Sequence, residues 1–305
     1  MDSPLSGQKD AKISLDPFRA LVRSEGTRLY RDLPWRQTRD PYEIWISEVM
    51  LQQTQVARVQ TRWQSWLDRF PSVFALAEAP AADVLSQWQG MGYNRRALAL
   101  KAAAERIVGE FEGRFPHDAA ALRALPGIGP ATAQGIRSFA FDMPGVYLET
   151  NVRTVFLHHF FPDVPGVPDR ELVGFVESTC PSEGEGPFAR PQDADDTPRS
   201  WYYALLDYGA YLKKTVPNPS RRSSGYSRQS RFEGSRRQKR AHIVRILLAG
   251  RGAPLGSDRI LDAVNRMEVS SGRPPVEADL VEGILADLSR EGFCVEITGD
   301  GWMIP

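Results

Sequence analysis

The chain has 305 residues and 42% hydrophobic content, enough for one large domain or two ordinary ones with a real core. It contains no stretch of 18 apolar residues, which excludes a membrane-spanning helix. The polar N-terminus, MDSPLSGQKDAKIS, lacks a hydrophobic signal core, so we expect a cytoplasmic protein. The two cysteines, Cys180 and Cys294, are far apart in sequence and predict neither a metal site nor a disulfide framework.

The formal net charge is zero, but the charges are unevenly distributed. Ten Lys or Arg residues and one acid, Glu233, lie between Lys213 and Arg240. A local basic stretch matters more than the total charge when the partner is a polyanion. The charge pattern is therefore compatible with a nucleic-acid partner.

The pattern before residue 240 is helical throughout. Asp40-Pro41 opens a first helix that runs through EIWISEVMLQQ, and Thr54 is expected to cap the next one, which continues to Phe70. Gly and Pro signals, GMG at 90–92 and PGIG at 126–129 among them, separate further helices. These are expected near 81–89, 94–112, 118–124, 130–141, 150–160, 169–179 and 198–213. The acidic stretch 181–197 is predicted to be a surface loop, and the fold class is all-α.

The C-terminal part has a different pattern. Residues 217–240 form a low-complexity Arg/Ser segment, either a linker or a tail that orders on DNA. Helices are expected near 238–249, 257–267 and 276–291, followed by two short strands around a Gly-Asp-Gly turn in FCVEITGDGWMIP. Three helices and a terminal hairpin favour a winged-helix-like module, and a miscellaneous α+β cap is the alternative.

The stretch LPGIG at 125–129, followed by a helix, is typical of a phosphate-binding hairpin. The glycines let the backbone of Pro126–Gly129 approach an anion closely, and the helix after them directs its N-terminal N–H groups at the same anion. Ile128 lies between Gly127 and Gly129 in this loop. The loop carbonyls could also hold a monovalent cation. An ordinary helix–helix turn is the alternative interpretation.

Two glutamates are candidates for acid–base chemistry. Glu48 shares a mostly apolar helix face with Ile44 and Trp45, and desolvation there would favour the protonated acid. Glu149, in YLETNVRTV, would lie just outside the start of a helix, where a carboxylate can stabilise a developing positive charge. The alternatives are a solvated or paired Glu48, and a Glu149 that only complements the helix dipole.

Together these stretches resemble the helix-hairpin-helix (HhH-GPD) base-excision DNA glycosylases, closest to the A/G-specific adenine glycosylases. The resemblance rests on LPWRQTRDPYEIWISEVMLQQTQV at 33–56, GMGYNRRA at 90–97, LPGIGPATA at 125–133, LETNVRTV at 148–155 and LLDYGA at 205–210. It implies an all-helical fold with DNA between two lobes. It divides the chain into a glycosylase domain at 1–214 (one lobe about 33–142, the other 1–32 plus 143–214), a basic linker at 215–240 and the module at 241–305.

The resemblance also implies roles on the DNA. Glu48 matches the acid that protonates the leaving base, Gln52 and Gln53 match groove-filling residues, and Tyr93 matches a wedge beside the orphaned base. Thr54 stands with the two glutamines at the helix end. Their polar side chains could fill the space of an extruded base.

Further residues match DNA-facing or structural positions of the family. Asn151 matches an asparagine of the catalytic loop, and residues 126–129 match the phosphate-gripping hairpin. Trp35 matches a structural residue and Arg36 a DNA-facing one. Phosphate contacts are expected from Arg153, Lys213, Lys214 and the arginines at 221–240, including Arg221 and Arg222.

Three departures from the family pattern bear on function. Glu149 stands where the family has a catalytic Asp. Ala131 stands where bifunctional relatives have a nucleophilic Lys, so no β-lyase activity is expected. The iron–sulfur cysteines of many relatives fall on residues that cannot ligate such a cluster, namely Lys213, Ser220, Ser223 and Gln229.

We therefore expect a monofunctional, metal-independent, monomeric DNA glycosylase of base excision repair that acts on double-stranded DNA with a damaged or mismatched base. No cofactor is expected, apart from a possible monovalent cation at the hairpin. The nearest family substrate is adenine opposite 8-oxoguanine or guanine. A modified or mismatched pyrimidine, such as 5-hydroxymethyluracil or thymine, is the alternative. A non-catalytic DNA-binding regulator is the second alternative.

Overall fold

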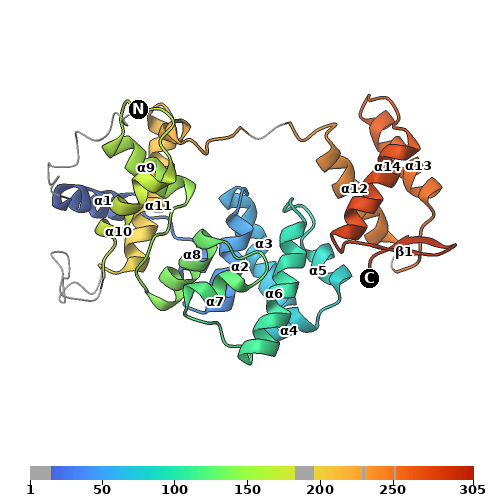
Figure 1. Cartoon of the computed structure of the whole chain (residues 1–305), viewed down its shortest axis with the longest axis horizontal. Helices are drawn as coiled ribbons and strands as arrows, with labels where there is room; N and C mark the ends of the chain where they lie inside the picture. The colour runs from blue at the N-terminus through green and yellow to red at the C-terminus, as the bar shows by residue number, and fades with distance from the viewer. Residues whose placement is uncertain (1–14, 183–195, 229–230, 251) are drawn as a thin grey trace, which may run out of the picture. The chain divides into compact units, whose positions relative to one another are not determined.

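The computed structural model describes residues 15–182, 196–228, 231–250 and 252–305. These residues are mainly helical, and their named strands are a single C-terminal pair (Figure 1). The all-α prediction with a small mixed C-terminal module is confirmed. Within the described ranges, no helix is both long and apolar enough to cross a membrane.

The chain folds into two compact units, and each combines two separate stretches of sequence. Unit 1 comprises Met1–Pro41 and Pro130–Ser227, and unit 2 comprises Tyr42–Gly129 and Arg228–Pro305. The LPGIG loop therefore ends unit 2's first stretch, and the helix after it opens the second stretch of unit 1.

Unit 1 is organised around its longest helix, α11, which packs against α1 and α9. Its other elements are α8, α10 and two short 3₁₀ helices. The bounds are α1 (Asp16–Arg28), η1 (Pro34–Arg36), α8 (Pro130–Phe141), α9 (Thr150–Phe160), α10 (Asp169–Thr179), α11 (Pro198–Thr215) and η2 (Pro219–Arg222). Aromatic rings fill the space between helices: Phe139 stacks on Tyr203 at 4.4 Å, and Phe18 meets Phe160 edge-on at 4.9 Å.

A buried ion pair fixes η1 to α11. Arg36 donates two hydrogen bonds of 2.8 Å to the carboxylate of Asp207, and its guanidinium lies 4.3 Å from the ring centre of Tyr203. Arg36 is only 6% exposed. The expectation that Arg36 faces DNA is therefore wrong, because its guanidinium forms a buried, two-bond ion pair with Asp207. Trp35 is buried, as expected of a structural residue.

The first part of unit 2 is a helical core rich in tryptophan. Its helices are α2 (Pro41–Leu51), α3 (Val56–Arg69), α4 (Val73–Glu78), α5 (Ala81–Gln87), α6 (Arg95–Phe111) and α7 (Ala119–Ala124). Trp66 packs edge-on against Phe70 and Trp88, and Trp45 packs against Phe115. All five rings are buried, and Trp45 anchors α2 in this core.

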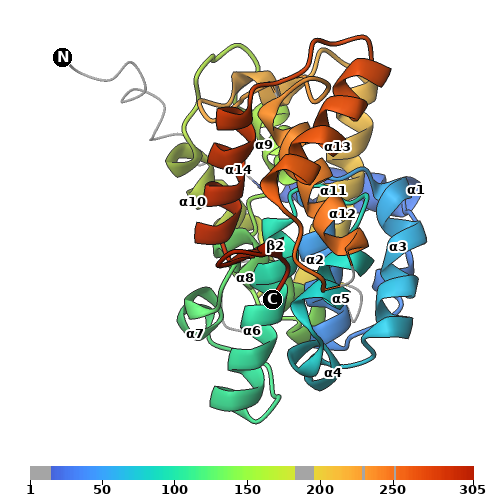
Figure 2. The ribbon, with the colours of Figure 1, turned by 90° about the vertical axis from the view of Figure 1, so that its right-hand side faces the viewer.

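The C-terminal part has three helices and a two-stranded hairpin, in the order predicted for a winged-helix-like module. Its elements are α12 (Arg236–Ala249), α13 (Ser257–Ser270), α14 (Ala278–Arg290), β1 (Val295–Ile297) and β2 (Gly301–Met303). The hairpin is antiparallel, with Glu296 opposite Trp302. Leu255, between α12 and α13, adds an isolated antiparallel bridge to Trp302. Both views show the three helices and the hairpin as one group (Figures 1 and 2).

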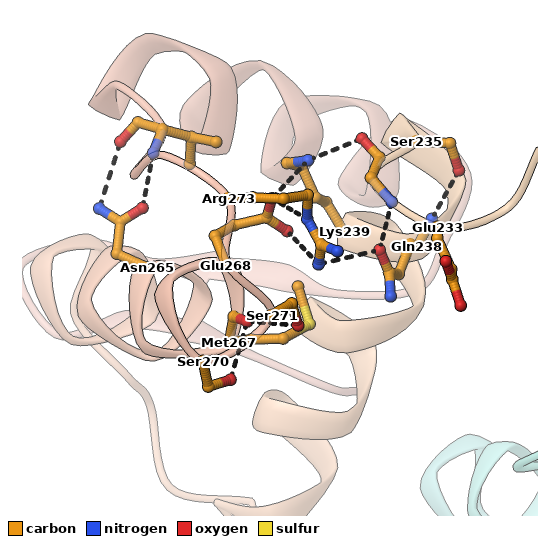
Figure 3. A network of polar contacts seen from close by, with 12 residues as sticks. Glu233, Ser235, Gln238, Lys239, Asn265, Met267, Glu268, Ser270, Ser271 and Arg273 are labelled. Carbon is orange, nitrogen blue, oxygen red and sulfur yellow. Dashed lines mark hydrogen bonds and ion pairs between the residues drawn. The ribbon is translucent and has the colours of Figure 1, made fainter.

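A polar network ties the start of α12 to α13 (Figure 3). Glu268, 2% exposed, binds Lys239 at 3.3 Å and Arg273 at 2.8 Å. Lys239 also donates to the carbonyl of Gly234, and Gln238 accepts from the amide of the same glycine. The hydrogen bond from Arg273 and the charges around it hold the pKa of Glu268 below its usual value. The first turn of α12 is therefore part of the module's core.

The helix predictions hold, with a few differences in detail. The N-cap of α3 is Gln55, and Thr54 instead donates its hydroxyl to the carbonyl of Gln52, so the predicted Thr54 cap is wrong. Helices α1 and α4 were not predicted. The predicted acidic loop 181–197 lies mostly outside the described residues.

Candidate active site

Glu48 lies in the last turns of α2, between side chains of the unit 2 core. Ile44, Trp45 and Val49 beside it are 1%, 0% and 4% exposed, and Glu48 itself is half-buried. Because α2 is anchored by these neighbours, the backbone that carries the carboxyl is fixed. The structure thus places this acid on a rigid helix, and its role as proton donor stays a prediction.

Two turns of unit 2 carry the residues that match groove-filling and wedge positions. The first follows α2 and contains Gln52, Gln53 and Thr54, of which Gln53 is exposed. The second precedes α6 and contains Tyr93, which is 41% exposed and accepts a hydrogen bond of 3.1 Å from Arg237. Gln53 and Tyr93 both have a positive φ, 53° and 49°, a conformation that few residues other than glycine adopt.

The LPGIG loop needs a glycine at position 127. Gly127 has φ +73°, and a Cβ there would lie 2.7 Å from the Cβ of Ala99. Ile128 is buried and its amide donates to the carbonyl of Leu125, which closes the turn. Gly129 is exposed, with nothing within 4 Å of a Cβ position. An open glycine directly before α8 suits close approach of an anion, and the phosphate and cation roles of Pro126–Gly129 stay predictions.

Glu149 is the N-cap of α9, as the sequence predicted. Its carboxylate accepts a 3.4 Å hydrogen bond from the amide of Thr150, and its carbonyl accepts from the amide of Arg153. Burial raises the pKa of Glu149, while the Thr150 amide and the charge of Arg153 lower it. Unlike Glu48, this carboxyl is therefore positioned by a helix terminus.

The first turn of α9 is pressed against α11. A Cβ at Gly209 would lie 2.1 Å from the carbonyl oxygen of Asn151, so only glycine allows this approach. Four residues further along α11, Lys213 reaches the side-chain oxygen of Asn151 at 3.4 Å, and burial lowers the pKa of this lysine. Asn151 and Lys213, both expected at DNA, thus contact each other beside Glu149.

Arg153 has a partner that the sequence did not suggest. Its guanidinium makes two 2.7 Å hydrogen bonds to the carboxylate of Asp169, at the start of α10. It also donates to the carbonyl of Leu148, directly before Glu149. Arg153 therefore holds the loop before α9 in place, and its phosphate contact stays a prediction.

The basic segment is partly folded. Arg222 donates to the carbonyls of Leu157 and Pro162 at the end of α9, so its guanidinium is occupied. Arg221 is exposed. Near the other end of the segment, Arg236 pairs with Asp287 and Arg240 with Glu291. Several of the expected phosphate contacts therefore have partners within the protein.

The residues at the expected cluster positions do not fit an iron–sulfur cluster. Ser220 and Ser223 are buried, and the hydroxyl of Ser220 donates to Asn218 at 2.7 Å. Ser223 forms a parallel bridge with Val167. The fourth position, Gln229, lies outside the described residues. Hydrogen bonds and the docking of η2 on α9 thus organise this segment without any thiolate.

The known proteins that resemble this chain are base excision DNA repair proteins and DNA glycosylases. Residues 46–170 match the HhH-GPD superfamily of base excision DNA repair proteins. The adenine DNA glycosylase of Mycolicibacterium smegmatis is 31% identical over 252 residues, which cover 77% of this chain and 81% of that protein. That of Buchnera aphidicola (subsp. Baizongia pistaciae) is 38% identical over 130 residues, 43% of this chain and only 37% of that protein. A thermostable thymine-DNA glycosylase structure shares the fold, with a TM-score of 0.54, 22% identity and coverage of 64% of this chain and 85% of that one.

Proposed function

Because this chain belongs to the HhH-GPD superfamily of base excision DNA repair proteins, a superfamily of DNA N-glycosylases, we propose that it removes adenine opposite 8-oxoguanine or guanine. The observation that carries the proposal is the likeness to the M. smegmatis adenine glycosylase. The matched region covers 77% of the chain, and neither unit alone holds that large a share of the residues. The likeness therefore extends into both units, one with Glu48 and the other with Glu149.

The proposed reaction is hydrolysis of the N-glycosidic bond of an extruded base in double-stranded DNA, by a monomer. Extrusion costs a few kcal/mol of lost stacking. Glu48 gives its proton to the leaving adenine, and the carboxylate of Glu149 stabilises the positive charge that develops on the sugar. Water then adds to the sugar carbon and releases a proton, which restores the protonated state of Glu48 through the solvent. The products are free adenine and an abasic site.

Strand cleavage is not part of the proposal. Ala131, in the first turn of α8, has no amine that could form an imine with the abasic sugar. The reaction is proposed to need no metal. Borohydride should therefore trap no protein–DNA adduct.

A panel of duplexes tests the proposal. The pure protein is incubated with adenine opposite 8-oxoguanine, adenine opposite guanine, thymine opposite guanine, and 5-hydroxymethyluracil, and abasic sites are then cleaved with alkali. We expect alkali-dependent cleavage at adenine. Cleavage only at a pyrimidine would replace the substrate, and no cleavage on any duplex would favour a DNA-binding regulator.

A further inference from the structure

The two DNA-facing turns of unit 2 share an unusual backbone feature. Gln53 and Tyr93 both lie in the left-handed region, although neither is a glycine. Such residues persist only where the surrounding structure holds them. The Tyr93 turn also contains Gly90 and Gly92 at positive φ. Something must therefore stabilise both turns.

One side chain, Arg96, contacts both turns. Its Nη1 donates to the carbonyls of Val49 at 2.8 Å, Met50 at 3.3 Å and Gln52 at 2.6 Å. Its Nη2 donates to the carbonyls of Gly92 at 2.9 Å and Met91 at 3.2 Å, and to the Thr54 hydroxyl at 3.3 Å. A single guanidinium thus joins the end of α2 to the loop before α6.

The chemistry of this position favours arginine over lysine. The planar guanidinium presents its N–H groups in two directions, whereas an ammonium is a compact point charge. Its positive charge lies at the C-terminus of α2, whose last carbonyls have no partner within the helix. The guanidinium carbon is 5.1 Å from the ring centre of Trp88 and 5.5 Å from that of Tyr93. Burial lowers the pKa of Arg96 to about 10, so it stays charged at neutral pH.

We infer that Arg96 is a positioning residue for base extrusion, which fixes the Gln52–Thr54 turn and the Tyr93 turn relative to each other. The groove-filling and wedge side chains then enter the duplex as one unit. Arg96 itself needs no contact with DNA for this role. The inference rests on the proposed function, because it assigns a device to the extrusion step of that reaction.

The test separates extrusion from excision. The fluorescence of 2-aminopurine next to the target adenine is measured on binding, in a Glu48→Gln background that leaves the base attached. Arg96→Met, which keeps the apolar stem, should lower the fluorescence rise at least tenfold, and Arg96→Lys should give an intermediate loss. Arg69→Met is the control, because Arg69 makes an exposed ion pair with Asp83 in the same unit. Arg69→Met should give the same fluorescence rise as the parent, which carries Glu48→Gln alone. Affinity for undamaged duplex should change less than threefold in every variant.

A double-mutant cycle between Arg96→Met and Tyr93→Leu separates positioning from general stability. If Arg96 positions Tyr93, Tyr93→Leu should lower extrusion in the parent. The same substitution should change extrusion little in the Arg96→Met background. Independent, multiplying penalties would overturn the inference, as would parental extrusion in Arg96→Met. If the Arg96-dependent fluorescence rise occurs but wild type excises no base, the inference stands and the proposed function falls. If Glu48→Gln gives no fluorescence rise although wild type excises adenine, the inference falls and the proposed function stands.

Discussion

Glu48 and Glu149 show two ways of holding a carboxyl group. Glu48 belongs to unit 2 and sits within a helix whose neighbouring side chains are buried. Glu149 belongs to unit 1 and caps a helix that is located by contacts with α10 and α11. The first position depends on core packing, and the second on a few specific contacts around a helix terminus. We therefore expect substitutions remote from the carboxyl to disturb Glu149 more easily than Glu48.

The largest expected effect is the loss of the Glu48 proton donor. Glu48→Gln keeps the shape of the side chain, so duplex binding should be unchanged, while excision should fall by on the order of 10²–10⁴-fold. Single-turnover excision and equilibrium binding measure the two quantities. Glu110→Gln, at an exposed ion pair with Arg106, is the control and should excise like wild type. A wild-type rate in Glu48→Gln would remove this residue from the mechanism.

The second prediction tests whether helix packing positions Glu149. Gly209→Ala would place a methyl group 2.1 Å from the Asn151 carbonyl and push α9 away from α11. It should cost about 1–3 kcal/mol of stability, and a displacement of about 1 Å at Glu149 should slow excision by on the order of 10²-fold. Thermal melting and single-turnover rates measure both effects.

Gly174→Ala is the matched control for this substitution. Gly174 lies in α10 with nothing within 4 Å of a Cβ position. Alanine should therefore leave excision unchanged and raise the melting temperature slightly, because it favours the helix. If Gly209→Ala behaved like this control, the packing account of Glu149 would be wrong.

The third prediction concerns pH. Burial raises the pKa of Glu149, and the charge of Arg153 lowers it. The proposed reaction uses Glu149 as a carboxylate, so activity should be lost as the pH falls through this raised pKa. Arg153→Met removes the lowering charge and should move the acid limb of the pH–rate profile to higher pH. Arg170→Met, at an exposed arginine of α10, should leave the profile in place. A downward shift in Arg153→Met would contradict the assignment.

The smallest expected effect concerns the basic segment. Arg221 and Arg228 are exposed, and each phosphate contact adds about 0.9 to the log–log salt slope of binding. Replacing both with Gln should therefore flatten the slope by up to about 2 units, with lesion preference unchanged. Lys239→Gln should instead lower the melting temperature and leave the slope unchanged, because it strips a partner from buried Glu268. A flattened slope in Lys239→Gln would mean that Lys239 also contacts phosphate.

Local sequence signals were sufficient for most of the helices and for the placement of Glu149. A hydrophobic segment followed by Thr150-Asn151 marks a helix start, and the structure has Glu149 as its N-cap. The winged-helix module followed from three helical patterns and a Gly-Asp-Gly turn. These signals act over a few residues, so they can be read without tertiary contacts.

Partners distant in sequence could not be predicted. The family resemblance matches Arg36 to a DNA-facing position, and nothing local reveals Asp207, which is 171 residues away. Gly209 looks like an ordinary helical glycine until Asn151 is packed against it. The bridging role of Arg96 depends on the turn after α2 lying beside the turn before α6, although its place within GMGYNRRA could have drawn attention to it. A search for arginines next to Gly-rich turns would be a useful signal.

We propose that Glu48 and Glu149 both take part in the excision reaction. Single-turnover release of adenine opposite 8-oxoguanine, compared among wild type, Glu48→Gln, Glu149→Gln and the double variant, tests it most directly. Groups that act as a unit are strongly non-additive, so the double variant should be about as slow as the slower single variant. Penalties that multiply, or a wild-type rate in either single variant, would contradict the claim.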